Sequence, residues 1–500
     1  MQFIDLHTHP NYKPFGNAHR ANGTILPISF DTKDRHCLYH YNSPSLFDKL
    51  AQMLLSVTKF SQTNGTAAYY GNVGCIVMSL GCIEQPFFKN NLGMGIGNLV
   101  DDFAAGFGLP RIKTIETLSN YWQDYQNEIS FITKGANAVL EIDGVHCTYK
   151  IVSNFNELQE NLNANELANA GKSADTPMIL SVIFSIEGLH ILNENLNAPM
   201  NETVVLGKVK ELKKMDHAPW FVTFSHHFNN HLCGHARSLR GMIAKLTTQE
   251  DNINQPFNEL GKKVLHLLLD NTQGKRVHID IKHMSVEARK YYRNWLLQNS
   301  TNDIPLIISH GVCNGLPKYE ATVSNYPALG NRFINPVEDV KGGDGTYKEH
   351  NSINFYDEEI IHMVKSNGIL GLQLDERRLA NEESIKRVKH SAWKHKIMHY
   401  RSELVWNQIQ YMGEMLDDNG LFAWGNIALG SDYDGIVDPL NSFWTIEQYP
   451  DLAQYVERHA HNYFTNNAGK LKHSFNKITA DELVERLFHR NAWDFFKKWY

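Results

Sequence analysis

The sequence predicts an α/β fold, specifically a (β/α)8 TIM-like barrel with long inserted loops and helices. Eight short apolar runs predict the strands, at residues 2–6, 73–80, 178–186, 220–225, 277–281, 305–309, 368–374 and 427–431. Most runs are continuous rather than alternating, which is typical of parallel strands buried on both faces. Helix-period segments such as VVLGKVKELKKM and LGKKVLHLLLDN lie between several of them. Eight strands alternating with helices favour a barrel; an open doubly wound sheet is the alternative.

The gaps between the strands predict a single barrel domain over residues 1–500, interrupted by insertions. These insertions fall around residues 10–71, 81–177, 230–255, 314–352 and 375–398. Residues 41–60 and 117–132 have helical patterns, and residues 479–500 form an amphipathic helical pattern with Thr479 as its N-cap. Because long loops in a barrel usually cover its active face, we expect the insertions near the functional site.

Composition excludes several classes of protein. The chain has 500 residues, of which 42% are hydrophobic and 20% charged, with a net charge of -6. This balance does not suggest nucleic acid or an anionic membrane as a partner. The sequence shows no signal peptide and no transmembrane run, and its six cysteines form no CxxC pair. We therefore expect free thiols in a reducing compartment and a cytoplasmic location.

Six of the eight predicted strands are followed by a metal-competent or titratable side chain. In chain order these residues are His7 and His9, Glu187, His226, His283, His310 and Asp432. Taken singly, each has an ordinary explanation, such as a histidine in a polar loop, Glu187 at the start of a helix or Asp432 in a turn. In a barrel, however, the strand ends converge on one mouth, so the set together predicts a shared metal site.

These residue types suit metal-dependent hydrolysis. Histidine supplies neutral nitrogen ligands, and a carboxylate can bridge two ions through its two oxygens. Two metals about 3.5–4 Å apart can hold a shared, bridging hydroxide and stabilise a developing oxyanion. A nearby aspartate can take up the proton and return it.

The motifs that follow the strands resemble those of the renal (membrane) dipeptidase family of the amidohydrolase superfamily. The matching stretches are IEGLH, FVTFSHHFNN, HIDIKHMSVEARK, LIISHGVCN and ALGSDYDG, followed by YPDL. Their order and spacing resemble that family from about residue 175 to the end, and NVGCIVMSL resembles its second strand. The resemblance implies two divalent metal ions, with zinc as the expected metal. Glu187 would bridge them, His7 and His9 would hold the first, and His283 and His310 the second.

The same resemblance implies roles for two further residues. Asp432 would act as general base towards the bridging water and as general acid towards the leaving amine. His226 would bind the substrate and stabilise its carbonyl oxygen as that oxygen becomes an oxyanion.

Two departures from the family pattern affect these expectations. The family usually has HxD after the first strand, whereas this chain has His7-Thr8-His9, so the first metal would lose one negative charge. The family also carries an arginine after the sixth-strand histidine that binds the free carboxylate of a dipeptide. Here that region is expanded, with Asn354 near the expected place and Arg332 as a candidate substitute from the inserted loop.

Three functions are compatible with these patterns. The favoured one is a binuclear, dipeptidase-like amidohydrolase that cleaves an amide bond in a dipeptide or similar small N-acyl amino acid. The second is a phosphoesterase of the polymerase-and-histidinol-phosphatase type, because DLHTHP also occurs in such domains. The third is a non-catalytic ligand-binding barrel. The expected partner is a small dipeptide-like molecule, and the long loops could join copies of the chain in a homo-oligomer.

Overall fold

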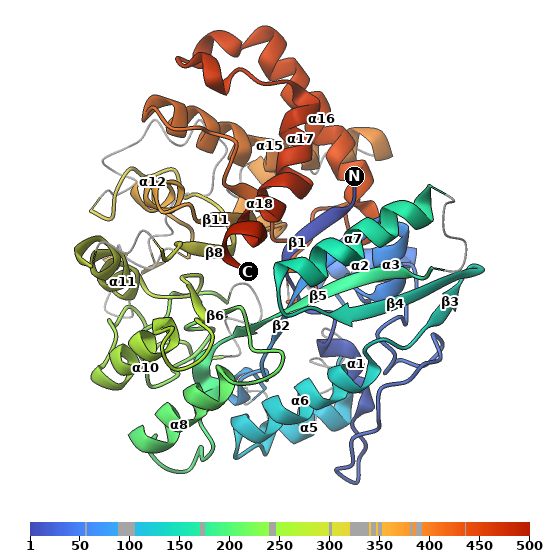
Figure 1. The fold of residues 1–500 in the computed structure, drawn as a ribbon, viewed down its shortest axis with the longest axis vertical. Helices are drawn as coiled ribbons and strands as arrows, with labels where there is room; N and C mark the ends of the chain where they lie inside the picture. The colour runs from blue at the N-terminus through green and yellow to red at the C-terminus, as the bar shows by residue number, and fades with distance from the viewer. Residues whose placement is uncertain are drawn as a thin grey trace.

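The computed structural model describes residues 1–55, 58–88, 106–170, 176–239, 247–299, 303–320, 340–341, 347–348, 353–380, 384–386, 393–435 and 437–500. Within these residues, eight parallel strands form a closed barrel (Figure 1). They are β1 (Phe3–Thr8), β2 (Val73–Leu80), β5 (Met178–Glu187), β6 (Phe221–Thr223), β7 (His278–Asp280), β8 (Ile307–Gly311), β11 (Ile369–Leu372) and β12 (Ile427–Leu429). Neighbours in this order pair with each other, and β12 pairs with β1.

Pairing between β2 and β5 joins two strands that are far apart in the sequence. Six residue pairs link them, from Cys75 with Ser181 to Leu80 with Ile186. The predicted barrel is therefore confirmed, and the open doubly wound sheet is wrong. Each predicted run overlaps one barrel strand, although β1, β5 and β8 extend past the ends of runs 2–6, 178–186 and 305–309. Runs 220–225 and 277–281 extend beyond β6 and β7 because Phe224 and Ile281 stay buried after the strand ladder ends.

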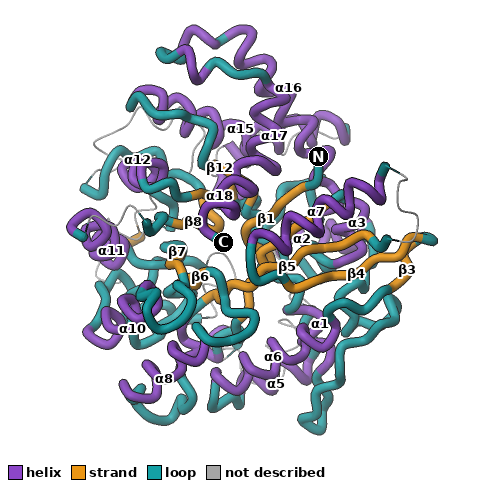
Figure 2. Tube along the Cα trace, in the orientation of Figure 1, coloured by secondary structure: helices purple, strands orange, loops and turns teal. Residues whose placement is uncertain are grey.

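Helices surround the barrel strands (Figure 2). Polar side chains start several of them: Asn154, Asn201, Asn258 and Ser285 each accept a backbone N–H in the first helical turn. These residues cap α7 (Phe155–Asn169), α8 (Glu202–Leu212), α10 (Glu259–Leu269) and α11 (Val286–Gln298). Later in the chain come α12 (Asp357–Lys365), α13 (Glu376–Leu379), α15 (Lys394–Asp418) and α16 (Tyr449–Asn466).

Helices of the first two insertions lie before β5. Besides α7, those among the described residues are α1 (Tyr12–Ala18), α2 (Leu46–Leu55), α3 (Gly65–Tyr70), α5 (Leu109–Glu116) and α6 (Tyr121–Gly135). The predicted helix at 117–132 corresponds to α6, which starts later because Asn120 is its N-cap. The predicted helix at 41–60 corresponds to α2, and its first residues stay outside the helix.

The C-terminal segment packs against the barrel. Thr479 caps α17 (Ala480–Glu485), as predicted, by accepting the N–H of Glu482. A π-helical turn, Arg486–Arg490, leads into α18 (Asn491–Trp499). The rings of Phe495 and Phe496 lie 5.3 and 5.0 Å from that of Trp220, so this segment buries aromatic surface.

A hairpin of β3 (Leu140–Ile142) and β4 (Val145–Ile151) was not predicted from the sequence. It lies within the predicted insertion 81–177, and β4 pairs in parallel with the first half of β5. Its turn is Asp143-Gly144, with φ of 49° and 78° at the two residues. An Asp-Gly pair is a typical signal for such a tight turn, so the hairpin had a signature that the strand analysis missed. A second, separate pair is β9 (Val340–Lys341) with β10 (Tyr347–Lys348).

Two further sequence expectations concern cysteines and membranes. All six cysteines are buried and form no disulfide, as expected. In the part of the chain that the structure describes, no helix is both long enough and apolar enough to cross a membrane.

Candidate metal centre

The first strand brings two histidines to the mouth of the barrel. His7 lies in β1 and His9 directly follows it; their Nε2 atoms are 3.1 Å apart, and both side chains are buried. Asp5 supports this strand end because one of its oxygens accepts the N–H groups of His7 and Ser431, at 3.1 and 3.0 Å. This contact ties β1 to the chain after β12. Burial raises the pKa of Asp5, and the hydrogen bonds offset that effect only in part.

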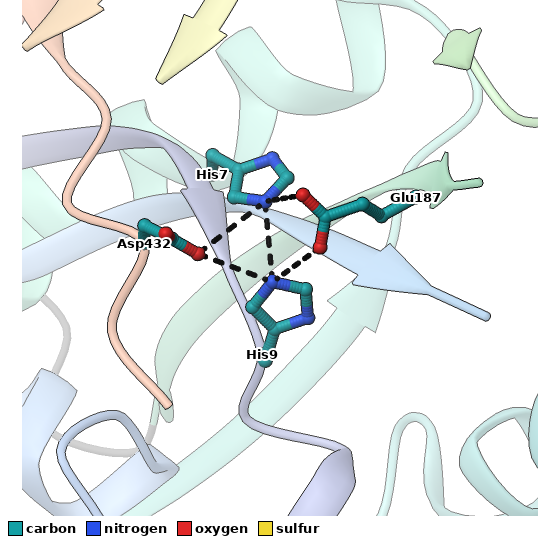
Figure 3. A group of neighbouring side chains, drawn as sticks. All are labelled: His7, His9, Glu187 and Asp432. Atoms are coloured by element: carbon teal, nitrogen blue, oxygen red, sulfur yellow. Dashed lines mark hydrogen bonds and ion pairs between the residues drawn. The ribbon is translucent and has the colours of Figure 1, made fainter. Parts of the chain in front are cut away.

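Glu187, the last residue of β5, lies between two groups of histidines. Its Oε2 is 3.1 Å from Nε2 of His9, and its Oε1 is 3.4 Å from Nε2 of His7 (Figure 3). The same Oε1 lies 3.4 Å from His283 and 3.5 Å from His310. Glu187 is 3% exposed. One carboxylate therefore contacts histidines from three other strand ends.

His283 and His310 form the second group. His310 lies in β8, and His283 follows β7 in a left-handed conformation with φ of 62°. Their Nε2 atoms are 3.3 Å apart. Asp280 ties β7 to β8, because it accepts the N–H of Ser309 at 2.9 Å and the Ser309 hydroxyl at 2.6 Å. Asp280 thus joins the strand ends that carry His283 and His310, as Asp5 joins the end of β1, which carries His7 and His9, to the chain after β12.

Asp432 follows β12 and completes the first group. Its Oδ1 is 3.4 Å from Nε2 of His9 and 3.8 Å from Nε2 of His7. Figure 3 shows this carboxylate facing both rings. The backbone of Asp432 is left-handed, with φ of 63°. Glycine is required at position 435, since a Cβ there would overlap Oδ1 of Asp432 and lie 2.9 Å from a ring carbon of His9. This close packing accounts for the glycine at the end of the DYDG sequence.

The donor atoms fit divalent metal ions. Two groups of side chains bring their ligand atoms within 4.8 Å of one another: His7, His9, Glu187 and Asp432, and Glu187, His283 and His310. Oε1 of Glu187 is buried and has no hydrogen-bond partner among the described residues. A buried carboxylate oxygen without a donor is costly, and a cation among neutral imidazoles would satisfy it.

The pKa of His9 and the pKa values of His283 and His310 shift in opposite directions. Burial lowers the pKa of His9, but hydrogen bonds and charges from Asp432 and Glu187 outweigh burial and raise that pKa to about 10. Burial lowers the pKa of His283 to about 3 and holds that of His310 well below its usual value. The two carboxylates therefore stabilise positive charge at the position of His9, as they would stabilise a bound cation.

His226 reaches the cluster from the loop after β6. Its Nε2 lies 3.4 Å from Oε2 of Glu187, and its Nδ1 lies 2.8 Å from Oε2 of Glu84. Burial opposes protonation of His226, yet the charges of Glu84 and Glu187 raise its pKa. Glu84 comes from the loop after β2, a strand for which the sequence analysis identified no site residue.

Gln373 was also missed by the sequence analysis. It directly follows β11, donates to Oδ2 of Asp432 at 2.8 Å and accepts from Nζ of Lys282 at 3.0 Å. Burial, followed by the charge of Arg378, lowers the pKa of Lys282 to about 7. An uncharged amide at a strand end gives no metal-ligand signal, which is why β11 showed no candidate.

A pocket opens onto this cluster. Glu187, His226 and Asp432 line it together with three cationic side chains, Lys282, Arg377 and Arg378, which we call the cationic wall. Arg377 pairs with Asp375 at 2.6 Å, and Arg378 is 5% exposed and donates to the carbonyl of Ser238.

One of the two predicted substrate contacts, Asn354, lies within the described residues. Asn354 is buried, and its side chain donates to the carbonyl of Arg378 at 3.2 Å. Arg332 lies outside the described residues. Arg378 was not predicted, because the family pattern places the carboxylate-binding arginine after the sixth strand, whereas Arg378 follows the seventh.

No protein-family model matches the chain, and no curated protein matches its sequence. Solved structures do match. A metallo peptidase from Rhodobacter sphaeroides, in complex with a phosphinate mimic of the dipeptide L-Ala-D-Ala, aligns with a TM-score of 0.50 and 11% identity, over 100% of this chain and 99% of that one. Dipeptidase AC, a metallo peptidase, aligns with a TM-score of 0.49 and 11% identity, over 100% and 98%. A probable dipeptidase from Pseudomonas aeruginosa gives 0.43 and 12%, over 88% of each chain.

The fold and the cluster define a (β/α)8 barrel with a group of histidines and acids, suited to a divalent metal, at one mouth. The chain shares the overall fold of the Rhodobacter sphaeroides metallo peptidase; at 11% identity this similarity concerns the fold alone. The resemblance seen in the sequence motifs is therefore confirmed at the level of the fold.

Proposed function

We propose that this chain is a metal-dependent amidohydrolase that cleaves an amide bond in a dipeptide or a similar small N-acyl amino acid. One observation carries the proposal: Glu187 presents its carboxylate to the pair His7 and His9 and to the pair His283 and His310. A carboxylate shared by two pairs of imidazoles suits a binuclear site. The dipeptide mimic bound by a structure with this fold supports the substrate class.

We assign the ligands accordingly. His7, His9 and Glu187 would hold one divalent ion, and Glu187, His283 and His310 the other, with zinc as the expected metal. Bound ions of this kind lower the pKa of water and polarise a carbonyl group.

Asp432 and His226 would perform the proton transfer and charge stabilisation. Asp432 has one oxygen turned towards His7 and His9, and we propose that this oxygen takes the proton of the attacking water. The same carboxyl would then return the proton to the leaving nitrogen. His226, through Nε2, would donate to the carbonyl oxygen of the substrate as negative charge develops there.

The cationic wall would bind the carboxylate of the substrate. We propose Arg378 as the principal anchor because it lines the same pocket as Glu187 and Asp432. A guanidinium suits this task since its paired N–H groups match the two oxygens of a carboxylate. Asn354, which contacts the backbone of Arg378, and Arg332 stay proposed contributors to substrate binding.

A substrate screen tests the proposed function. Zinc-loaded protein is assayed against a panel of dipeptides and N-acyl amino acids, with aryl phosphates as the discriminating control. We expect turnover of at least one amide and none of the phosphates. Turnover of phosphates alone would favour the phosphoesterase, and binding of zinc with no turnover of any substrate would favour the non-catalytic barrel.

A further inference from the structure

A buried carboxylate connects the loops that follow β2 and β6. Glu84 is 3% exposed, and its two oxygens have separate partners. Oε1 accepts the backbone N–H groups of His227 at 2.9 Å and Phe228 at 3.3 Å. Oε2 lies 2.8 Å from Nδ1 of His226. Oε1 thus holds the backbone of the loop, and Oε2 holds the imidazole of His226.

The contact with Glu84 determines which edge of the His226 ring, and therefore which ring nitrogen, points towards the cluster. An imidazole can rotate about its Cβ–Cγ bond and exchange the positions of its two nitrogens with carbons. An ionised carboxylate only accepts hydrogen bonds, so Nδ1 must carry the proton while it contacts Glu84. Nε2 then points towards Glu187, 3.4 Å from Oε2.

We infer that Glu84 is a positioning residue: it holds the N–H of Nδ1 of His226 and thereby keeps Nε2 directed at the substrate carbonyl. The inference rests on the proposed function for its catalytic consequence, although the hydrogen bond itself does not depend on it. A carboxylate that orients a catalytic imidazole acts on turnover without touching the substrate.

Kinetics of Glu84→Gln tests the consequence. Glutamine keeps an oxygen for the two backbone N–H groups but presents an N–H donor to Nδ1, which can then no longer donate. We expect kcat to fall about 10- to 100-fold with KM changed less than about threefold, as for other partners that orient residues of metal sites. The matched control is Glu128→Gln, a buried carboxylate that accepts a backbone N–H from Gly81 at 2.9 Å. We expect this variant to keep the wild-type kcat.

A double-mutant cycle separates positioning from general support of the loop. If Glu84 acts through His226, adding Glu84→Gln to His226→Ala lowers kcat by less than about twofold beyond the single His226→Ala change. An unchanged kcat for Glu84→Gln alone would overturn the inference. So would an equal loss of kcat with and without His226.

A spectroscopic measurement decides the inference without any activity. Metal-free protein labelled with 15N-histidine is examined by NMR, and the His226 signals are identified by their loss in His226→Ala. We expect Nδ1 of the wild-type ring to be protonated, and the proton to leave Nδ1 in Glu84→Gln. An unprotonated Nδ1 in the wild-type protein would overturn the inference even if the variant failed to fold. If the protein hydrolyses no amide but Nδ1 is protonated, the proposed function is wrong, whereas the contact between Glu84 and His226 is confirmed.

Discussion

The side-chain amide of Gln373 donates to Oδ2 of Asp432 at 2.8 Å, and the opposite oxygen of Asp432 lies 3.4 Å from Nε2 of His9. Gln373 in turn accepts from Lys282 at 3.0 Å, so its amide cannot flip without exchanging donor and acceptor. The two contacts leave Oδ1 of Asp432 facing the first pair of histidines. A buried amide therefore orients the carboxylate that we propose as the general base.

Replacing Gln373 with methionine removes this donor at similar volume. We expect kcat to fall about 10- to 100-fold, because Asp432 loses the hydrogen bond that orients it, whereas KM changes little. Steady-state kinetics measures both. Gln408→Met is the control: Gln408 is also fully buried, but it donates to the carbonyl of Leu379 at 2.9 Å, and its loss should lower the melting temperature without changing kcat. Equal kcat values for the Gln373 variant and the wild type would contradict the orienting role.

Asp432→Asn separates proton transfer from metal binding. The amide keeps the shape of the carboxylate and an oxygen that can accept from Gln373, but it is too weak a base to take a proton. We expect kcat to fall about 10²- to 10⁴-fold, the range typical of general acid–base groups. Metal content, measured by elemental analysis, should stay the same. Unaltered turnover would remove Asp432 from its proposed role.

His9→Ala tests the ligand that departs from the family pattern. His9 contacts both Glu187 and Asp432, so its loss should weaken one site and leave His283 and His310 unaffected. Elemental analysis of protein purified without chelator should find about two metal ions per wild-type chain and about one per variant chain. His231→Ala, an exposed histidine outside the cluster, should keep the wild-type content. Two ions in the His9 variant would exclude His9 as a required ligand.

A pair of arginine variants identifies the carboxylate anchor. Arg378→Met should raise KM for substrates with a free carboxylate about 10- to 100-fold, since a charge-assisted hydrogen bond contributes about 1.5–3 kcal/mol. The corresponding amide-capped substrates should show a smaller change. Arg332→Ala should leave KM unchanged if Arg378 is the anchor. If Arg332→Ala alone raises KM, then Arg332 in the inserted loop, and not Arg378, binds the carboxylate of the substrate.

Buried histidines predict loss of stability in mild acid. Burial lowers the pKa of His19, His278 and His459 from 6.5 to about 4. Between these values the unfolded chain binds more protons than the folded one, so the free energy of unfolding falls as pH decreases from about 6.5 to 4. Each residue contributes at most about 1.4 kcal/mol per pH unit.

Urea unfolding at pH 7 and pH 5 measures this effect. His459→Gln should reduce the loss of stability between the two pH values by about 2 kcal/mol relative to the wild type. The exposed His231, changed to Gln, should leave the loss as it is. An equal loss of stability in His459→Gln and in the wild type would contradict the contribution of His459.

Local patterns in the sequence were enough to predict much of the fold. Buried parallel strands need continuous apolar residues, so all eight runs could be located, and the strand ends in turn identified the histidines, Glu187 and Asp432. The β3–β4 hairpin was missed because β4 is only partly buried and carries polar residues, although Asp143-Gly144 gave a turn signal. The roles of the strand-end residues stay predictions until the variants above are measured.

The sequence by itself determined the kind and order of the barrel strands and the chemically competent residues at their ends, because burial and backbone conformation act on neighbours along the chain. Only the tertiary structure decided which residues meet across the barrel mouth. Glu84 with His226 and Gln373 with Asp432 are separated by 142 and 59 positions. Such pairings depend on barrel closure and loop packing, for which no spacing along a single chain segment provides a signal.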